Sequence, residues 1–178
     1  MTKLEFGCAK VNFGIPQTKI TMRKIEQLLE EYGDSHRNPL NKTIHWICVP
    51  TIFFCVVALI WSIPAGFLQS FSVSTYANWA TVALILVMIY YLTLSVMLSL
   101  GMLLFASACL WLAGYLEAEL VWPLWQFALG LFVLAWIGQF YGHHVEGKKP
   151  SFFKDLQFLL IGPAWLMHFI YRRIGIPY

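Results

Sequence analysis

Between Lys42 and Lys148 the chain contains no lysine or arginine. Of its 178 residues, 59% are hydrophobic and 12% are charged, and the mean hydropathy is +0.66. A typical soluble domain has about 25% charged residues, and a soluble fold of this size has no interior that could bury so much apolar surface. The cation-free block therefore predicts an all-α protein, a polytopic helical bundle for which membrane lipid is the solvent.

Uncharged stretches inside this block are long enough for about four membrane-spanning helices, at roughly 20 residues each. Residues 77–116 carry no charge and are about twice that length, so we expect two helices joined by a turn near residues 93–95. The predicted spans are residues 44–63, 77–93, 96–116 and 121–141.

The segments before and after the four predicted spans are expected to differ in structure. Residues 1–19 are mixed in composition, and we expect them to be poorly ordered and to precede a single membrane domain over residues 20–178. Residues 20–32 have apolar positions at helical spacing, which predicts an amphipathic helix. That helix lies either on the membrane surface or against the protein's own cytosolic face. Residues 156–171 are apolar but short and contain a Gly-Pro break, which predicts a re-entrant or interfacial helix.

The positions of lysine and arginine predict the orientation in the membrane. These residues occur only in segments 1–42, 148–154 and 172–173, and the positive-inside rule places such segments on the cytosolic side. An even number of crossings then puts both termini in the cytosol, in a bacterial inner membrane or an ER-type membrane. With a net charge of only +3, the expected partner is membrane lipid and not nucleic acid, and the oligomeric state stays open.

Histidines stand at both edges of the cation-free block. His36 and His45 lie at the start of the first predicted span, and His143, His144 and Glu146 follow the fourth. In an up-down bundle the first and fourth helices can be neighbours, which would gather these side chains at the cytosolic boundary. Imidazole and carboxylate groups without thiolates suit iron, zinc or manganese. The pattern predicts one shared metal site.

Spacing restricts how the two front histidines can share a metal. His36 and His45 are nine positions apart, which places them on opposite sides of an unbroken helix. They can meet only if the chain folds back at Asn38-Pro39, where an N-cap residue precedes a proline suited to the first helical position. Asn41 precedes His45 by four positions, so we expect it to orient that imidazole without binding the metal itself.

The back motif adds two predicted ligands. His143 and Glu146 share a face if the fourth helix continues for one more turn, so both could reach one metal ion. His144 would then point elsewhere, and its part in cofactor binding stays open. His168 stands alone on an apolar segment and is predicted to contact lipid headgroups.

Two other functions are compatible with these residues. A non-catalytic, lipid-binding membrane scaffold would use its histidines only for headgroup contacts. A haem-binding or metal-transport bundle would also carry histidines, but transport predicts ionisable residues near the middle of the bilayer. The central parts of the four predicted spans hold almost none, which disfavours transport.

Two segments together resemble the signatures of the Mpo1-like family, formerly called DUF962. The first, at residues 32–50, reads YGDSHRNPLNKTIHWICVP. The second, at residues 139–150, reads QFYGHHVEGKKP and is followed by LLIGP at residues 159–163. The resemblance covers roughly residues 25–170.

The resemblance implies an iron(II)-dependent dioxygenase that shortens 2-hydroxy fatty acids by one carbon, as in fatty acid α-oxidation. It implies Fe²⁺ as the cofactor, a 2-hydroxy fatty acid and dioxygen as substrates, and no 2-oxoglutarate. The histidines of the family fall on His36, His45 and His143 as catalytic metal ligands, with Glu146 as the matching acid. The family pattern does not require a histidine at His144.

Overall fold

The computed structural model describes residues 22–71, 74–147 and 158–178. The predicted poorly ordered segment 1–19 lies outside these residues, as do the first positions of the two flanking segments predicted to be helical. The described residues form helices and connections, with no strand among them. The all-α class predicted from the sequence is thus confirmed.

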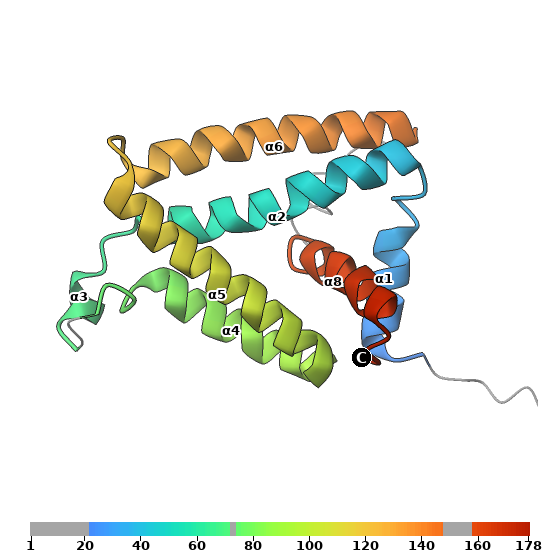
Figure 1. Cartoon of the computed structure of the whole chain (residues 1–178), viewed down its shortest axis with the longest axis horizontal. Coiled ribbons are helices and arrows are strands. Elements are labelled where there is room, and N and C mark those ends of the chain that lie inside the picture. Colours follow the sequence, from blue (N-terminus) through green and yellow to red (C-terminus); the bar gives the residue numbers. More distant parts are fainter. Residues whose placement is uncertain (1–21, 72–73, 148–157) are drawn as a thin grey trace, which may run out of the picture.

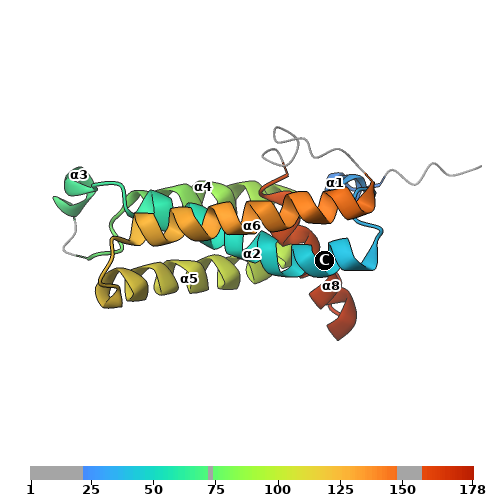
Figure 2. The same ribbon diagram turned by 90° about the horizontal axis from the view of Figure 1, so that it is seen from above.

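Two long helices run side by side in Figure 1, one of them along an outer edge of the fold. Helix α2, Pro39–Trp61, and helix α6, Leu124–Glu146, run antiparallel and pack along their length, and Figure 2 shows the same pairing from above. The Asn38 side chain accepts a hydrogen bond from the Leu40 amide at 2.9 Å and caps α2, and Pro39 takes the first helical position. The start of α2 therefore lies beside the end of α6.

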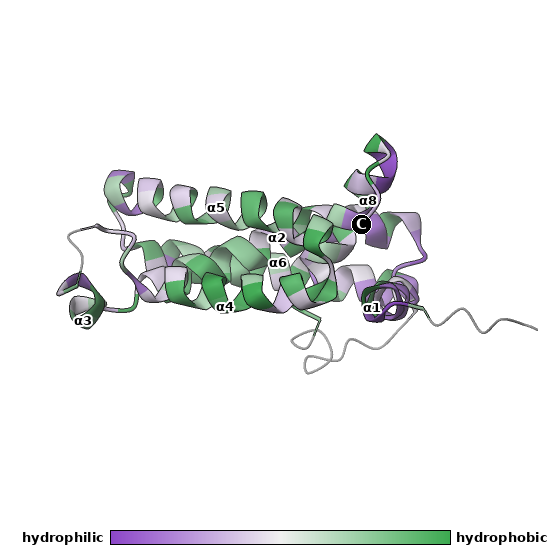
Figure 3. Ribbon diagram, turned by 90° about the horizontal axis from the view of Figure 1, so that it is seen from below, coloured by the Kyte–Doolittle hydropathy of each residue, from purple (hydrophilic) through white to green (hydrophobic). Residues whose placement is uncertain are grey.

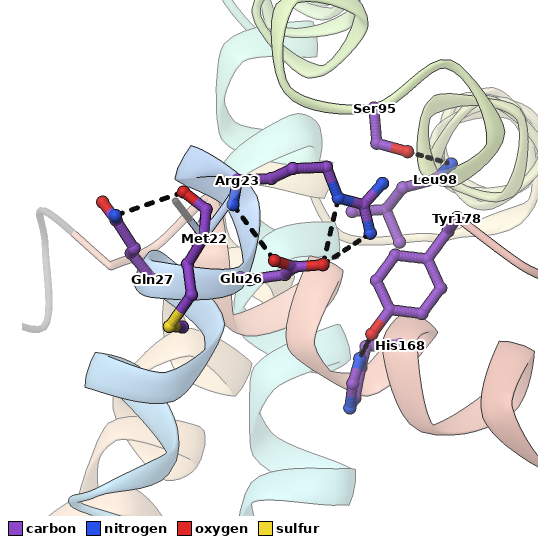
Figure 4. Close-up of polar contacts among 8 residues, drawn as sticks. All are labelled: Met22, Arg23, Glu26, Gln27, Ser95, Leu98, His168 and Tyr178. Carbon is purple, nitrogen blue, oxygen red and sulfur yellow. Dashed lines mark hydrogen bonds and ion pairs between the residues drawn. The ribbon is translucent and has the colours of Figure 1, made fainter. Parts of the chain in front are cut away.

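Helices α4, Trp79–Leu94, and α5, Val96–Glu119, form a hairpin with only Ser95 between them. Ser95 has an extended backbone, and its hydroxyl accepts a hydrogen bond from the Leu98 amide at 3.3 Å (Figure 4). One residue can reverse the chain here because this cap satisfies a backbone donor that the helix leaves unpaired. The turn falls where the sequence predicted it.

Three of the described helices, α2, α5 and α6, are long and apolar enough to cross a membrane. Helix α4 is also apolar but has 16 residues, about 24 Å against a hydrocarbon thickness of about 30 Å. Green, hydrophobic residues dominate the middle of these helices in Figure 3, whereas purple residues gather on α1, on the one-turn helix α3 (Gly66–Gln69) and near the C-terminus. These features make the chain a membrane protein with four apolar helices.

The two remaining helices pack together at the end of the bundle where α2 begins and α6 ends (Figure 1). Helix α1, Lys24–Gly33, buries Ile25, Leu29 and Tyr32 in a cluster shared with α8, Ile161–Ile174. The apolar face of the amphipathic helix is therefore covered by the protein itself and not by lipid. Helix α8 is placed between α1, α2 and α5.

The C-terminal residue ties α1 to α8 (Figure 4). The Tyr178 hydroxyl is hydrogen-bonded to Nδ1 of His168, and the Arg23 guanidinium lies 5.9 Å from the centre of the Tyr178 ring. Arg23 also pairs with Glu26 at 2.7 Å and lowers the pKa of that carboxyl. His168 is thus engaged within the protein, where burial, aided by Arg172, lowers its pKa. The contact with Tyr178 was not predicted from the sequence, and the headgroup contact of His168 stays a prediction.

Candidate metal centre

Three buried imidazoles meet at the junction of α1, α2 and α6. His36 lies in the connection before α2, His45 in the second turn of α2, and His143 in the last turn of α6. Their exposed fractions are 3%, 1% and 5%. One coordinating nitrogen from each ring lies within 4.8 Å of the others. This separation is on the order of twice a metal–nitrogen bond of about 2.1 Å, so one ion between the rings could contact all three. We call these residues the histidine triad.

The break between α1 and α2 brings the first two histidines together. Helix α1 ends at Gly33, the His36 amide donates to the Gly33 carbonyl at 2.9 Å, and the chain reverses before Pro39. The ring centres of His36 and His45 are consequently 4.2 Å apart, and that of His143 lies 5.4 and 5.0 Å from them. The fold-back that the breaker residues predicted is present.

Backbone carbonyls set the tautomer of two of the three rings. Nδ1 of His36 lies 2.6 Å from the Tyr32 carbonyl oxygen, and Nδ1 of His45 lies 2.9 Å from the Asn41 carbonyl oxygen. A carbonyl only accepts, so each Nδ1 carries the proton and donates it. The lone pair of each neutral ring is then on Nε2, which is the form that binds a metal. The Tyr32 ring also stacks on His36, with ring centres 4.2 Å apart.

Glu146 lies beside the segment that carries His36, and its carboxylate is outside the group of three histidines that could hold a metal. The carboxylate accepts hydrogen bonds from the Arg37 and Asn38 amides at 2.8 Å each and from the Asn41 side chain at 3.0 Å. Its oxygens therefore face the connection before α2, and among the described residues the group that could hold a metal contains only histidines. Glu146 ties the end of α6 to the segment that carries His36, over a separation of more than 100 residues.

Asn41 supports the triad in two ways. It is fully buried, and its side-chain amide donates to the Ser35 carbonyl at 3.1 Å as well as to Glu146. Its backbone carbonyl, not its side chain, holds the His45 ring. The predicted orienting residue is therefore adjacent to His45, although by a main-chain atom. His144, the residue after the triad member His143, is exposed on α6.

Two glycines of α6 that the sequence analysis did not single out allow α2 to approach closely. A Cβ atom on Gly138 would lie 2.8 Å from Cys48 Sγ, and one on Gly142 would collide with Asn41 Oδ1. The signal was present in the sequence as a small-xxx-small pattern, which is typical of closely packed membrane helices. Because His143 follows Gly142 directly, this close approach sets the distance between His143 and the other two rings.

We expect Gly142→Ala to damage the site without changing any polar group. The added methyl would displace the buried Asn41 amide, at a cost of about 1–3 kcal/mol for overpacking, and should weaken metal binding. Thermal unfolding in detergent and an iron(II) titration would measure both effects.

Gly130→Ala is the matched control, since it is on the same helix and a Cβ there meets nothing within 4 Å. It should be neutral, or stabilising by up to about 1 kcal/mol. Equal behaviour of the two variants would contradict the close-approach interpretation.

A small cavity adjoins the triad. It encloses about 20 Å³ and is lined by His45, His143 and Gln139, with Leu159 among the apolar residues that complete it. This volume is room for about one water-sized molecule. A ligand larger than this requires the cavity to enlarge.

The fold and the triad together define a class: a membrane-embedded α-helical bundle with a buried three-histidine centre at one end. The sequence model of the family described as "2-hydroxy-palmitic acid dioxygenase Mpo1-like" matches residues 22–174. The chain belongs to this Mpo1-like family.

A characterised relative supports the same assignment. The chain is 33% identical over 146 residues to 2-hydroxy-palmitic acid dioxygenase MPO1 of Saccharomyces cerevisiae, which covers 81% of this chain and 78% of the yeast protein. No solved structure matches the chain.

Proposed function

We propose that the chain is an iron(II)-dependent membrane dioxygenase that shortens 2-hydroxy fatty acids by one carbon. The observation that carries the proposal is the buried triad of His36, His45 and His143 at one end of a set of apolar helices. The yeast relative, whose name specifies a 2-hydroxy acid and a dioxygenase, supports the substrate and the reaction class.

The donor set fits iron. Three imidazole ligands leave coordination positions open for substrate and dioxygen, as non-haem iron oxygenases require. Imidazoles also suit zinc, copper and nickel, but zinc has no redox chemistry and would not activate dioxygen. When bound, iron(II) would supply Lewis acidity and one-electron transfer.

The protein's own residues would hold the reacting groups and exclude water. The Nδ1–carbonyl bonds of His36 and His45 fix the direction of each Nε2 lone pair. Burial of all three rings keeps bulk water from the centre. The polar end of α6 and the apolar helices next to it match a substrate with a charged head and a hydrocarbon tail.

The lysine and arginine distribution supports a cytosolic position for this centre. All twelve lysines and arginines lie at or beyond the two ends of the block between Lys42 and Lys148, and the histidine triad lies near those same ends. The positive-inside rule therefore favours a cytosolic position for both termini and for the triad. A substrate partitioned into the inner leaflet would present its carboxylate at that depth.

The test is anaerobic loading followed by exposure to oxygen. Metal-free protein in detergent should bind one iron(II) per chain, and oxygen with 2-hydroxypalmitic acid should then yield the acid one carbon shorter, identified by mass. Zinc-loaded protein serves as the control and should yield no product. Failure of the reduced protein to bind iron, or equal product with zinc, would contradict the proposal.

A further inference from the structure

An apolar groove runs between α2 and α4 and shares a wall with the cavity at the triad. Its lining includes Phe53 and Ile60 of α2, Ala80 and Ala83 of α4, and Leu159, which also lines the cavity at the triad. All of its lining side chains are hydrocarbon. We propose that this groove, the acyl groove, holds the hydrocarbon tail of the substrate and that Leu159 is the gate between the groove and the triad. The proposal rests on the function proposed above.

The acyl groove is preferred over a second apolar groove because it adjoins the cavity at the triad. Leu159 lines both the cavity beside His45 and His143 and the acyl groove. A second apolar groove, between α2, α5 and α8, is lined by Trp46 and Met167 and shares none of its described lining residues with that cavity. A tail held in the second groove would have no direct path to the triad.

The distance from the triad to the far end of the groove suits an acyl chain. Ile60 lies about four turns along α2 from His45, or about 22 Å at 1.5 Å per residue. One leaflet of the hydrocarbon core is about 15 Å thick, which is the span of a membrane acyl chain. With its head at the triad, a tail of that class would reach the far end of the groove along α2.

The width of the groove depends on two alanines. Ala80 and Ala83 are one helical turn apart and present small side chains toward α2. In the structure the groove encloses about 60 Å³, so an entering tail must also displace the Leu159 side chain. The turn that carries Leu159 is held in place, because the buried Tyr91 hydroxyl donates to the Leu160 carbonyl. We therefore assign opening to a movement of the Leu159 side chain.

The decisive variant is Ala83→Phe, which fills the groove at a distance from the triad. Turnover of a 16-carbon 2-hydroxy acid should fall at least about tenfold relative to an 8-carbon one, since discrimination by hydrocarbon length is of this order even for single methylenes. Activity on the 8-carbon acid would show that the variant is folded. Ala108→Phe is the matched control, because Ala108 is exposed on α5, and its ratio should equal that of the wild type.

A binding measurement tests the same inference without turnover. A 16-carbon 2-hydroxy acid with a terminal diazirine should crosslink to the α4 peptide that contains Ala83, and excess 2-hydroxypalmitic acid should suppress this crosslink more than excess phospholipid does. Equal suppression by phospholipid would mean that the groove holds a bilayer lipid, which overturns the inference.

The two proposals fail in different ways. If the wild type forms no product at any chain length, the proposed function is wrong, and the assignment of the groove to the substrate tail is wrong with it. If the wild type is active but Ala83→Phe and Ala108→Phe have the same length preference, the acyl groove alone is wrong. Leu159→Trp should lower turnover of both acids, because it closes the gate itself, and a fully active Leu159→Trp variant would exclude the gate.

Discussion

His143→Ala is expected to weaken iron(II) binding by more than about 100-fold, since losing a partner of a metal ligand already costs about 10–100-fold. Conversion of 2-hydroxypalmitic acid should fall to background. The physical reason is that His143 supplies the only triad nitrogen from α6, and its ring is 5% exposed and lies among the other two. Iron stoichiometry by elemental analysis and product formation by mass spectrometry would measure the result.

His144→Ala provides the control at the next position. His144 is exposed, so iron stoichiometry and turnover should stay within about twofold of the wild type, as for a surface substitution. Each variant removes one imidazole from the same turn of α6, and the two positions differ in burial. Retained iron binding in His143→Ala, or loss of iron in His144→Ala, would refute the assignment of the triad.

Glu146→Ala should produce the second largest effect, and of a different kind. The carboxylate accepts three hydrogen bonds from the segment around His36, and a hydrogen bond to a charged group contributes about 1.5–3 kcal/mol. We expect a lower melting temperature and an iron affinity reduced about 10–100-fold, with one iron per chain restored at saturating iron.

Saturating iron separates a positioning residue from a ligand. A ligand role for Glu146, as the sequence predicted, would leave a changed coordination sphere in the iron-saturated variant, visible by X-ray absorption or by the spectrum of a cobalt(II) substitute. A positioning role leaves that spectrum unchanged. Glu119→Ala, which removes an exposed carboxylate at the other end of the bundle, should alter neither affinity nor stability.

The helices were predictable because their signals are local. Apolar length marks a span, and an Asn-Pro pair marks a helix start, whatever surrounds them. The fold-back before Pro39 was predictable for the same reason, and it follows that His36 and His45 can meet. The neighbouring position of α2 and α6 was a hypothesis about topology, and the structure bears it out.

The atoms that support the triad were not predictable in this way. The spacing of His143 and Glu146 correctly put both residues near α2, but it could not say which would face the other histidines. That choice depends on backbone amides of Arg37 and Asn38, whose directions follow from the fold-back and not from their side chains. A carboxylate beside unpaired backbone donors is stabilised by accepting from them.

The sequence alone was sufficient to predict a membrane-embedded all-α fold, the approximate ends of the apolar helices and the set of histidines to which the triad belongs. Composition and periodicity suffice for these features because burial in lipid and helix capping act within one segment. The tertiary structure decided that Glu146 serves as a tie, that Gly142 admits Asn41, and that Leu159 separates the cavity from the acyl groove. These features depend on contacts between segments about 100 residues apart in the first two cases, and side-chain direction at such contacts is set only when the helices have packed.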